Sequence, residues 1–409
     1  MALIVQKYGG SSVGSIDRIR NVARRLIETQ QNGNRVVAVI SAMSGVTDKL
    51  IGLAHEMTEH PSDAELDVLL ATGEQQSVAL LCMAIDDMGY KAMSFTGAQA
   101  GISTYGSHTR GRIMNIEPSG VLRALDEGNI VVCAGFQGVS HDGGRIHTLG
   151  RGGSDLSAIA MAAAVKADLC QIYTDVDGVY TCDPRVVKEA RKIPVLCYEE
   201  MLEMASSGSK VMQARSVEFA KKFGVVFEVR NSMNNNSGTI VQEENPAMES
   251  LAVRGVSIER NQARVTVSGI TAPVAYTAII LSALAKAEIN IDMIVANVAH
   301  DGVARQSFTM NMNDLGAAQA ALQKVLPQLG DKARLETESG LAKLSVVGVG
   351  MRSNSGVAAT VFQSLADAGI CTGMIATSEI RISTTVDAAD IEKAARVVHA
   401  AFRLDRVSA

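Results

Sequence analysis

Lys7-Tyr8-Gly9-Gly10-Ser11-Ser12 and Gly150-Arg151-Gly152-Gly153-Ser154-Asp155 are the two stretches that say most about how this chain folds. Each places glycines and a hydroxyl group where a strand or loop leads into a predicted helix. Such a junction exposes backbone N–H groups at the positive end of a helix, which suits phosphate. Each stretch also carries one cation, Lys7 or Arg151. Two anion-binding loops in one chain predict a nucleotide phosphate held near an anionic second substrate.

Strand-like and helix-like segments alternate from residue 1 to about residue 240. Strands are expected at residues 3–6, 36–41, 92–95, 130–135 and 169–174, and helices at about 16–30, 63–88, 119–127, 155–164 and 198–223. This order predicts an α/β domain with a mostly parallel, doubly wound sheet. Ligands bind such a sheet beyond the carboxyl ends of its strands, where Lys7, Ser41 and Asp175 lie.

An internal repeat follows a polar, turn-rich linker. A strand–helix–strand pattern ending near Met293 recurs with an offset of 81 residues and ends near Met374. This repeat predicts two packed copies of one small ferredoxin-like α+β module. We therefore divide the chain into a first domain at 1–240, a linker at 241–262, and two modules at 263–340 and 341–409.

The composition is that of a globular protein: 409 residues with a net charge of −5, of which 47% are hydrophobic and 20% charged. No basic block occurs, which argues against nucleic acid as a partner. The N-terminal segment lacks the features of a signal peptide, and no apolar stretch is expected to span a membrane. Six scattered cysteines without a Cys-x-x-Cys pair indicate reduced thiols in a cytoplasmic protein. The seven histidines show no ligand spacing, so no protein-bound metal is expected.

Several nucleotide-binding classes are excluded by missing motifs. The chain has no P-loop sequence and no protein-kinase signatures. Gly348-Val349-Gly350 begins like a dinucleotide fingerprint, but Ser353 stands where the third glycine is required. A dehydrogenase is therefore disfavoured.

The candidate site residues each have a second interpretation. Lys7 could neutralise a transferring phosphoryl group or be an exposed lysine at a strand end. Arg151 could bind a carboxylate in bidentate fashion or be a surface arginine. Glu74 could bind an ammonium group or be a solvated helix residue. Ser154 could do no more than cap its helix, and Asp155 could complement the helix dipole or orient nearby cations.

Together these segments resemble the aspartate kinases of the amino-acid kinase family. The segments that carry the resemblance are 7–13, 39–43, 70–74, 135–138, 148–155, 173–185 and 207–212. It extends over the whole chain, since two C-terminal ACT modules form that family's regulatory half. It implies the amino-acid kinase fold and transfer of the γ-phosphoryl group of MgATP to the side-chain carboxylate of L-aspartate. That reaction begins lysine, threonine and methionine biosynthesis. An aspartate carboxylate is ionised at neutral pH, so the reaction needs no general base.

The resemblance also implies roles for individual residues. The implied catalytic residues are Lys7, Asp155 and Lys210, and those implied to bind the nucleotide are Lys7, Tyr8, Gly9, Gly10, Ser11, Thr174, Asp175, Tyr180, Asp183, Arg185 and Lys210. The residues implied to bind aspartate are Ser41, Thr47, Glu74, Arg151, Gly152, Gly153 and Ser154. The residues implied to bind an effector are Asn290, Ile291, Asp292, Asn297, Ser378 and Glu379. Mg²⁺ is expected to arrive mainly with the phosphates.

The regulatory half departs from the family pattern. Ala272-Pro273-Val274-Ala275 stands where Asp-x-Pro-Gly is common, and Ser353-Asn354-Ser355-Gly356 stands where Ser-His-Pro-Gly is common. Threonine, lysine or both are the expected effectors, and lysine alone is expected to be the weaker. A homo-oligomer is expected, or a hetero-oligomer with a separate ACT-containing chain started at Met248. Two alternatives stay open: a sibling kinase acting on another carboxylate, and a degenerate kinase that acts as a regulatory protein.

Overall fold

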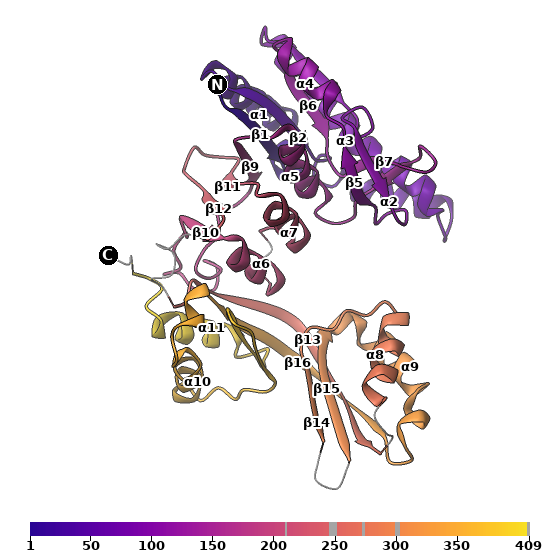
Figure 1. Ribbon diagram of the computed structural model, residues 1–409, viewed down its shortest axis with the longest axis vertical. Coiled ribbons are helices and arrows are strands. Elements are labelled where there is room, and N and C mark those ends of the chain that lie inside the picture. Colours follow the sequence, from indigo (N-terminus) through magenta and orange to yellow (C-terminus); the bar gives the residue numbers. More distant parts are fainter. Residues whose placement is uncertain (209–210, 245–251, 272–274, 299–302, 407–409) are drawn as a thin grey trace. The chain divides into compact units, whose positions relative to one another are not determined.

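The computed structural model describes residues 1–208, 211–244, 252–271, 275–298 and 303–406 (Figure 1). It forms two compact units. The N-terminal unit comprises Met1–Val179, Lys192–Ala205 and Lys210–Asn245, and the C-terminal unit comprises Tyr180–Arg191, Ser206–Ser209 and Pro246–Ala409. Two short segments of the expected first domain, 1–240, therefore belong to the C-terminal unit.

An eight-stranded sheet forms the centre of the N-terminal unit, in the order β10-β12-β11-β9-β1-β2-β6-β3. These strands are β1 (Leu3–Tyr8), β2 (Arg35–Ile40), β3 (Ala92–Phe95), β6 (Ile130–Ala134), β9 (Leu169–Thr174), β10 (Val195–Cys197), β11 (Phe227–Asn231) and β12 (Thr239–Gln242). Every neighbouring pair is parallel except β11 with β12. The prediction of a mostly parallel sheet is confirmed.

Helices cover this sheet because its strands are apolar on both faces. Alternate residues of β2, Val36, Ala38 and Ile40, join a core cluster with residues of α1 (Ile16–Gln31) and α3 (Asp63–Asp87). The intervening Val37 and Val39 are equally buried. Helix α5 (Gly153–Val165) packs against β1, β2 and β9. Such two-sided burial is typical of strands in parallel sheets.

The remaining elements of this unit frame the sheet. They are α2 (Val46–Met57), α4 (Ser119–Asp126), α6 (Tyr198–Ser206), α7 (Ala214–Phe223), and a smaller sheet of β4 (Ile102–Tyr105), β5 (Arg112–Ile116), β7 (Gln137–Ser140) and β8 (Ile146–Thr148). The single helix expected at 198–223 is wrong, because α6 ends at Ser206 and α7 begins at Ala214. Gly208, with a φ of +108°, adopts a backbone conformation that ends an α-helix.

By length and composition, α3 could cross a membrane, contrary to the expectation that no segment could. Half of its apolar window is buried inside the structure. The buried side chains of α3 include two carboxylates, those of Asp67 and Glu74. The apolar composition is therefore that of a core helix, which passes the same test.

The C-terminal unit contains one antiparallel six-stranded sheet, in the order β14-β15-β13-β16-β18-β17. Its elements are β13 (Gly255–Ile270), α8 (Tyr276–Lys286), β14 (Ile294–Val298), β15 (Ala304–Asn311), α9 (Leu315–Gln323), β16 (Arg334–Val347), α10 (Val357–Asp367), β17 (Ile375–Thr377), β18 (Arg381–Asp387) and α11 (Ile391–Ala401). A helix, two strands and a helix follow β13, and the same order of elements follows β16, as the sequence repeat predicts.

The two modules share their long strands. The first part of β13 pairs with the second part of β16, as in Gly255 opposite Val347, and the second part of β13 pairs with β15. Residues 255–262, which fall within the expected linker, therefore form part of this sheet. One core cluster surrounds Phe308 of the first module and another surrounds Leu344 of the second.

Lys343 of β16 is a buried cation where these strands meet. Its side chain is 2% exposed, and its Nζ lies 2.8 Å from Glu259 Oε2 on β13. It also forms an ion pair with Asp292, just before β14. Asp292, expected to bind an effector, therefore has a partner within the unit.

We predict that the two carboxylates act together on Lys343. Either Glu259→Gln or Asp292→Asn leaves the ammonium group one charged partner, whereas the double variant leaves it buried and unpaired, at a cost of about 3–5 kcal/mol. The loss of unfolding free energy in the double variant should exceed the sum of the two single losses. Urea unfolding followed by far-UV circular dichroism measures all three. Additive losses would contradict a shared role.

Candidate active site

The carboxyl ends of the central strands meet at one edge of the large sheet. Tyr8 of β1 lies opposite Ile40 of β2 and Tyr173 of β9 in parallel register. Ser41 continues this alignment, since its N–H donates to the Tyr8 carbonyl at 3.1 Å. The sheet therefore brings Lys7, Ser41 and Asp175 to the same edge, as predicted.

Lys7 is buried and paired. Its Nζ lies 2.5 Å from Asp155 Oδ1, and the two side chains are 11% and 13% exposed. Asp155 lies in the first turn of α5. The interpretation of Lys7 as an exposed strand-end residue is wrong, and the ion pair joins the two stretches that the sequence singled out.

The glycines after Lys7 allow close approach of the backbone. A Cβ on Gly9 would lie 3.4 Å from Lys7 Nζ, and one on Gly10 would lie 2.9 Å from the Ala42 carbonyl oxygen. The short 3-10 helix Gly10–Val13 follows, and the Ser11 carbonyl accepts a hydrogen bond from Arg18. The glycines therefore let the loop backbone lie close to the ammonium group of Lys7 and to Ala42.

Helix α5 begins two residues earlier than an N-cap at Ser154 would require. Gly152 is the N-cap residue, with a φ of +73°, and the helix starts at Gly153. A Cβ on Gly153 would lie 2.9 Å from side-chain atoms of Leu149 and Phe136. Ser154 therefore lies in the first turn and is not the N-cap, and no side chain caps this helix end.

Glu74 is buried, so its interpretation as a solvated helix residue is wrong. It is 4% exposed, and its Oε1 accepts a hydrogen bond from the Ala42 N–H at 3.0 Å. Its Oε2 has no hydrogen-bond partner among the described residues. Burial raises the pKa of Glu74 from 4.5 to about 7, against the opposing effect of the Ala42 N–H. A cationic ligand group would complete this site.

The other expected aspartate-binding residues surround the same edge. Thr47 lies in the first turn of α2, whose N-cap is Gly45. Arg151 is exposed and has no ion pair or hydrogen bond to any residue that the structure describes. Its side chain is therefore available to a ligand.

The residues that the resemblance assigns to nucleotide binding include members of each unit. Thr174 ends β9 and Asp175 follows it in the N-terminal unit, where the Thr174 hydroxyl donates to Asp175 at 3.1 Å. Tyr180, Asp183 and Arg185 belong to the C-terminal unit. Hydrogen bonds from Arg185 hold the pKa of Asp183 below its usual value. Lys210 lies outside the described residues.

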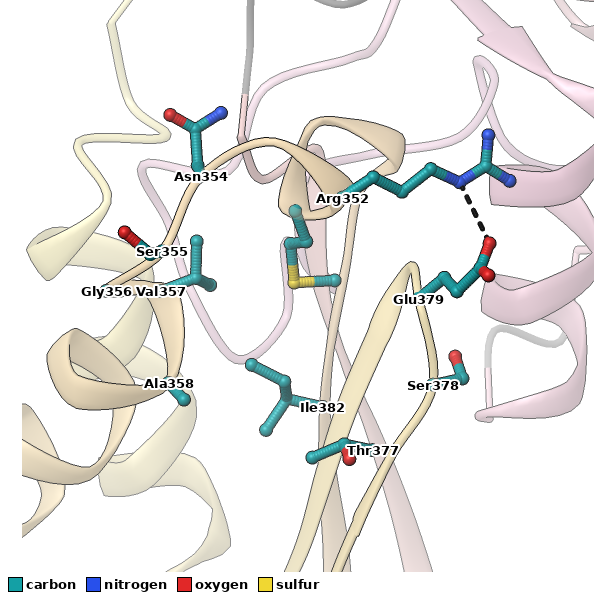
Figure 2. A pocket seen from close by; sticks show the side chains of 11 residues that line it. Arg352, Asn354, Ser355, Gly356, Val357, Ala358, Thr377, Ser378, Glu379 and Ile382 are labelled. Atoms are coloured by element: carbon teal, nitrogen blue, oxygen red, sulfur yellow. Dashed lines mark ion pairs between the residues drawn. The ribbon is translucent and has the colours of Figure 1, made fainter.

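The expected effector residues fall in two places in the C-terminal unit. Asn290, Ile291 and Asp292 precede β14, and Asn297 is exposed on it. Ser378 and Glu379 line a pocket of about 510 Å³ in the second module (Figure 2). The divergent first loop, 272–275, and Met248 lie outside the described residues, apart from Ala275, which precedes α8.

Sequence reasoning missed residues that act through the backbone or through burial. The Ala42 N–H, which binds Glu74, carries no side-chain signal. Asp67 precedes Glu74 by seven residues on α3 and is fully buried. The spacing of two acids by two helical turns was a usable signal, since it places both on one helix face. Arg352, which forms an ion pair with Glu379 at 3.4 Å, was also missed.

Comparison with known proteins identifies the family. The model of the amino acid kinase family matches residues 2–231, and an ACT domain model matches residues 344–402. The aspartokinase of Geobacillus stearothermophilus is 51% identical over 99% of this chain and 98% of that protein. The chain belongs to the aspartokinase family. Aspartokinase 2 of Bacillus subtilis is 47% identical over 99% of both chains. The predicted aspartate kinase with regulatory ACT modules is confirmed by these relatives.

Solved structures agree with this assignment. E. coli aspartokinase III in complex with aspartate and ADP, in the R-state, has a TM-score of 0.79 at 25% identity, over 98% of this chain and 99% of that chain. The same enzyme with lysine and aspartate, in the T-state, has a TM-score of 0.76 at 25% identity, over 97% and 99% of the two chains. The amino-acid kinase fold followed by ACT modules is confirmed.

We predict that Glu74 destabilises the native protein at high pH. Its pKa is about 7 in the native state against 4.5 ordinarily. Below pH 4.5 the carboxyl group is protonated in both the native and the unfolded state, so it has no destabilising effect. Between pH 4.5 and about 7 the unfolded state loses the proton first, and the destabilisation grows to about 3 kcal/mol above pH 7. The Tm difference between Glu74→Gln and the unchanged protein should become more positive from pH 5 to pH 8. Glu56→Gln, at an exposed position of α2, is the control. A difference that does not vary with pH would contradict the assignment.

Proposed function

We propose that this aspartokinase transfers the γ-phosphoryl group of ATP to the side-chain carboxylate of L-aspartate, forming 4-phospho-L-aspartate and ADP. The observation that carries the proposal is the buried Lys7–Asp155 ion pair between two glycine-rich loops. Glu74, with its unpartnered carboxylate oxygen, contacts the same residue, Ala42, that Gly10 approaches. Phosphate-binding and ammonium-binding groups therefore converge at one edge of the sheet.

The chemistry needs little beyond positioning and charge neutralisation. The attacking carboxylate is already ionised at neutral pH, so no general base has to remove a proton. Lys7 stabilises the negative charge of the transferring phosphoryl group. Asp155 orients Lys7, and the backbone N–H groups of Gly9, Gly10 and Ser11 contact phosphate oxygens.

The remaining nucleotide contacts are assigned by resemblance. They come from Tyr8, Thr174, Asp175, Tyr180, Asp183, Arg185 and Lys210. The described residues contain no group of three metal-ligating side chains, and the phosphates are the groups that would mainly hold Mg²⁺. When bound, that ion neutralises phosphate charge.

Aspartate is held by charge and by a helix end. Arg151 binds its α-carboxylate in bidentate geometry, and Glu74 binds its ammonium group through the unpartnered Oε2. Ser41 and Thr47 contribute hydroxyl groups, and Gly152, Gly153 and Ser154, at a helix start that no side chain caps, complete the site.

A comparison of acceptors tests the proposal directly. Coupled ADP release should show aspartate as substrate, with glutamate and N-acetylglutamate at least about 100-fold poorer in kcat/KM, because they are longer or lack the free ammonium group. Preference for either alternative acceptor would overturn the proposed specificity. ATP turnover with none of the three would overturn the proposed reaction.

We predict that Lys7→Ala lowers kcat by roughly 100-fold or more, the scale expected for one preorganised electrostatic partner. Steady-state kinetics at saturating ATP and aspartate measure the change. Lys49→Ala, at an exposed position of α2, is a matched control. A kcat close to that of the unchanged enzyme would remove Lys7 from the mechanism.

The product suits an early step of biosynthesis. An acyl phosphate is an activated carboxylate, so a reductive or acyl-transfer reaction would consume it, in keeping with the route to lysine, threonine and methionine. We place the enzyme in the cytoplasm. All six cysteines are free thiols, five of them buried, which suits a reducing compartment.

We propose regulation by threonine, lysine or both, through the ACT modules. The pocket of Figure 2 is lined by apolar side chains, which include Met351 and Ile382, and by polar ones, which include Ser378. Arg352 and Glu379, which form an ion pair, also line it. These groups match the ends of an amino-acid zwitterion. Inhibition then requires that the effector bind a less active state more tightly.

Subunit association would complete such sites. The edge strand β14 exposes Ile294 and Val298, and the edge strand β17 exposes Ile375. Apolar side chains on unpaired sheet edges suit pairing with another module. A homo-oligomer follows from this proposal, as does a hetero-oligomer with a separate ACT-containing chain.

We predict that millimolar threonine, lysine or their mixture lowers activity, with lysine alone the weaker. Glu379→Gln should raise the effector concentration that gives half inhibition, because it removes one charge from the pocket. Asp390→Asn, an acid of the same module outside the pocket, is the control. Asn297→Ala tests the first module without disturbing Lys343. Activity that stays constant across these amino acids would contradict the regulatory proposal.

A further inference from the structure

The loop that carries Arg151, residues 149–152, is irregular and lies between β8 and α5. Gly150 and Gly152 have φ values of +75° and +73°. Neither sheet pairing nor helix geometry determines its conformation. Backbone hydrogen bonds from the Leu149 N–H to the Phe136 carbonyl and from the Gly153 N–H to the Gly150 carbonyl hold its two ends, and side chains from elsewhere add to them.

Asp67 holds the beginning of this loop. The carboxylate is fully buried on α3, and its Oδ1 accepts a hydrogen bond from the Thr148 hydroxyl at 2.5 Å. The Thr109 N–H donates to both carboxylate oxygens, at 3.0 and 3.1 Å. His108 Nδ1 lies 2.7 Å from Oδ2. One buried carboxylate therefore ties the segment before Arg151 to a second segment, 108–111.

Arg215 of α7 holds the same two segments from another side. Its Nη1 donates to the Leu149 carbonyl and its Nη2 donates to the Gly111 carbonyl, both at 3.0 Å. The Gly111 N–H donates to the Thr148 carbonyl at 2.8 Å. The segments 108–111 and 148–149 are thus joined to each other, and each is also bound by the charged side chains of Asp67 and Arg215. We call these two side chains and the two segments the Asp67–Arg215 clamp.

Backbone strain within the clamp indicates a functional role. Thr109 has a φ of +62°, an unusual conformation for a β-branched residue, and such strain persists where surrounding contacts enforce it. A Cβ on Gly150 would lie 3.3 Å from the Thr109 carbonyl oxygen, and one on Gly152 would lie 2.1 Å from Gln213 Cγ. The strained segment and the start of α7 therefore press against the loop on either side of Arg151.

We infer that Asp67 and Arg215 are positioning residues for the acceptor substrate, and that they fix the place of Arg151 without touching substrate themselves. The inference rests on the proposed role of Arg151 in binding the α-carboxylate. A loop displaced by about 1 Å can cost two orders of magnitude in activity. The loss should fall on aspartate and spare ATP, because Lys7 and Gly9–Gly10 lie on a different loop.

The test compares nearly isosteric and conservative substitutions. Thr148→Val removes only the hydroxyl that binds Asp67, and should raise KM for aspartate by about 10-fold with KM for ATP within about twofold. Thr148→Ser keeps the hydroxyl and should give a smaller rise. Arg215→Lys reaches one carbonyl at a time, so its effect should lie between those of the unchanged enzyme and Arg215→Ala. Lys222→Ala, at an exposed position of the same helix, is the control.

Arg151→Ala separates the two claims. If Arg151→Ala raises KM for aspartate while Thr148→Val and Arg215→Lys do not, the clamp is overturned and the proposed function stands. If Arg151→Ala has no such effect, the proposed role of Arg151 fails first. Equal losses for aspartate and ATP, together with a lowered Tm in Thr148→Val and Arg215→Lys, would assign the clamp to stability alone and overturn the inference.

Discussion

The ion pair between Lys7 and Asp155 is the interaction on which the catalytic half depends. It joins the end of the first strand to the start of α5, and both partners are withdrawn from water. Removing one partner from such a pair leaves an uncompensated charge, so the pair fixes where the strand and helix meet. The parallel register of β1 with β2 and β9 then sets Ser41 and Asp175 beside it. A cation kept at a glycine loop by a buried acid is ready for phosphate without reorganisation.

The consequence of burial for Glu74, whose carboxylate has no ion-pair partner among the described residues, is the opposite of that for the paired Lys7 and Asp155. Asp155 is compensated within the protein, whereas one oxygen of Glu74 lacks a hydrogen-bond partner and its pKa rises to about 7. A group left in this condition lowers the stability of the unliganded protein. In the proposed aspartate site, a ligand ammonium group would restore the missing interaction in a low-dielectric setting. Stability is often lower where a site is built for a ligand.

In the C-terminal unit, shared strands determine how the modules are related. β13 and β16 each contribute to both modules, so neither module has a complete sheet without the other. Lys343 lies on one of these strands and binds Asp292, which belongs to the proposed effector segment 290–292. A shift of that segment would therefore change the contacts of β16, a strand that both modules share. Cys182, Val186 and Val187, from the segment Tyr180–Arg191, pack into the core of the second module.

The sequence by itself determined the alternation of strands and helices, the two glycine loops and the repeat of 81 residues, because each depends on local pattern. Only the tertiary structure decided that Glu74 and Asp67 are buried, since α3 is so apolar that its sequence does not show which face packs inward. The same holds for the break between α6 and α7 and for the N-cap at Gly152. Partners such as Thr148 with Asp67, or Gly255 with Val347, are far apart in the chain, and local pattern does not specify which distant groups meet. Packing also sets the pKa of a buried carboxylate, because desolvation depends on every neighbouring element together.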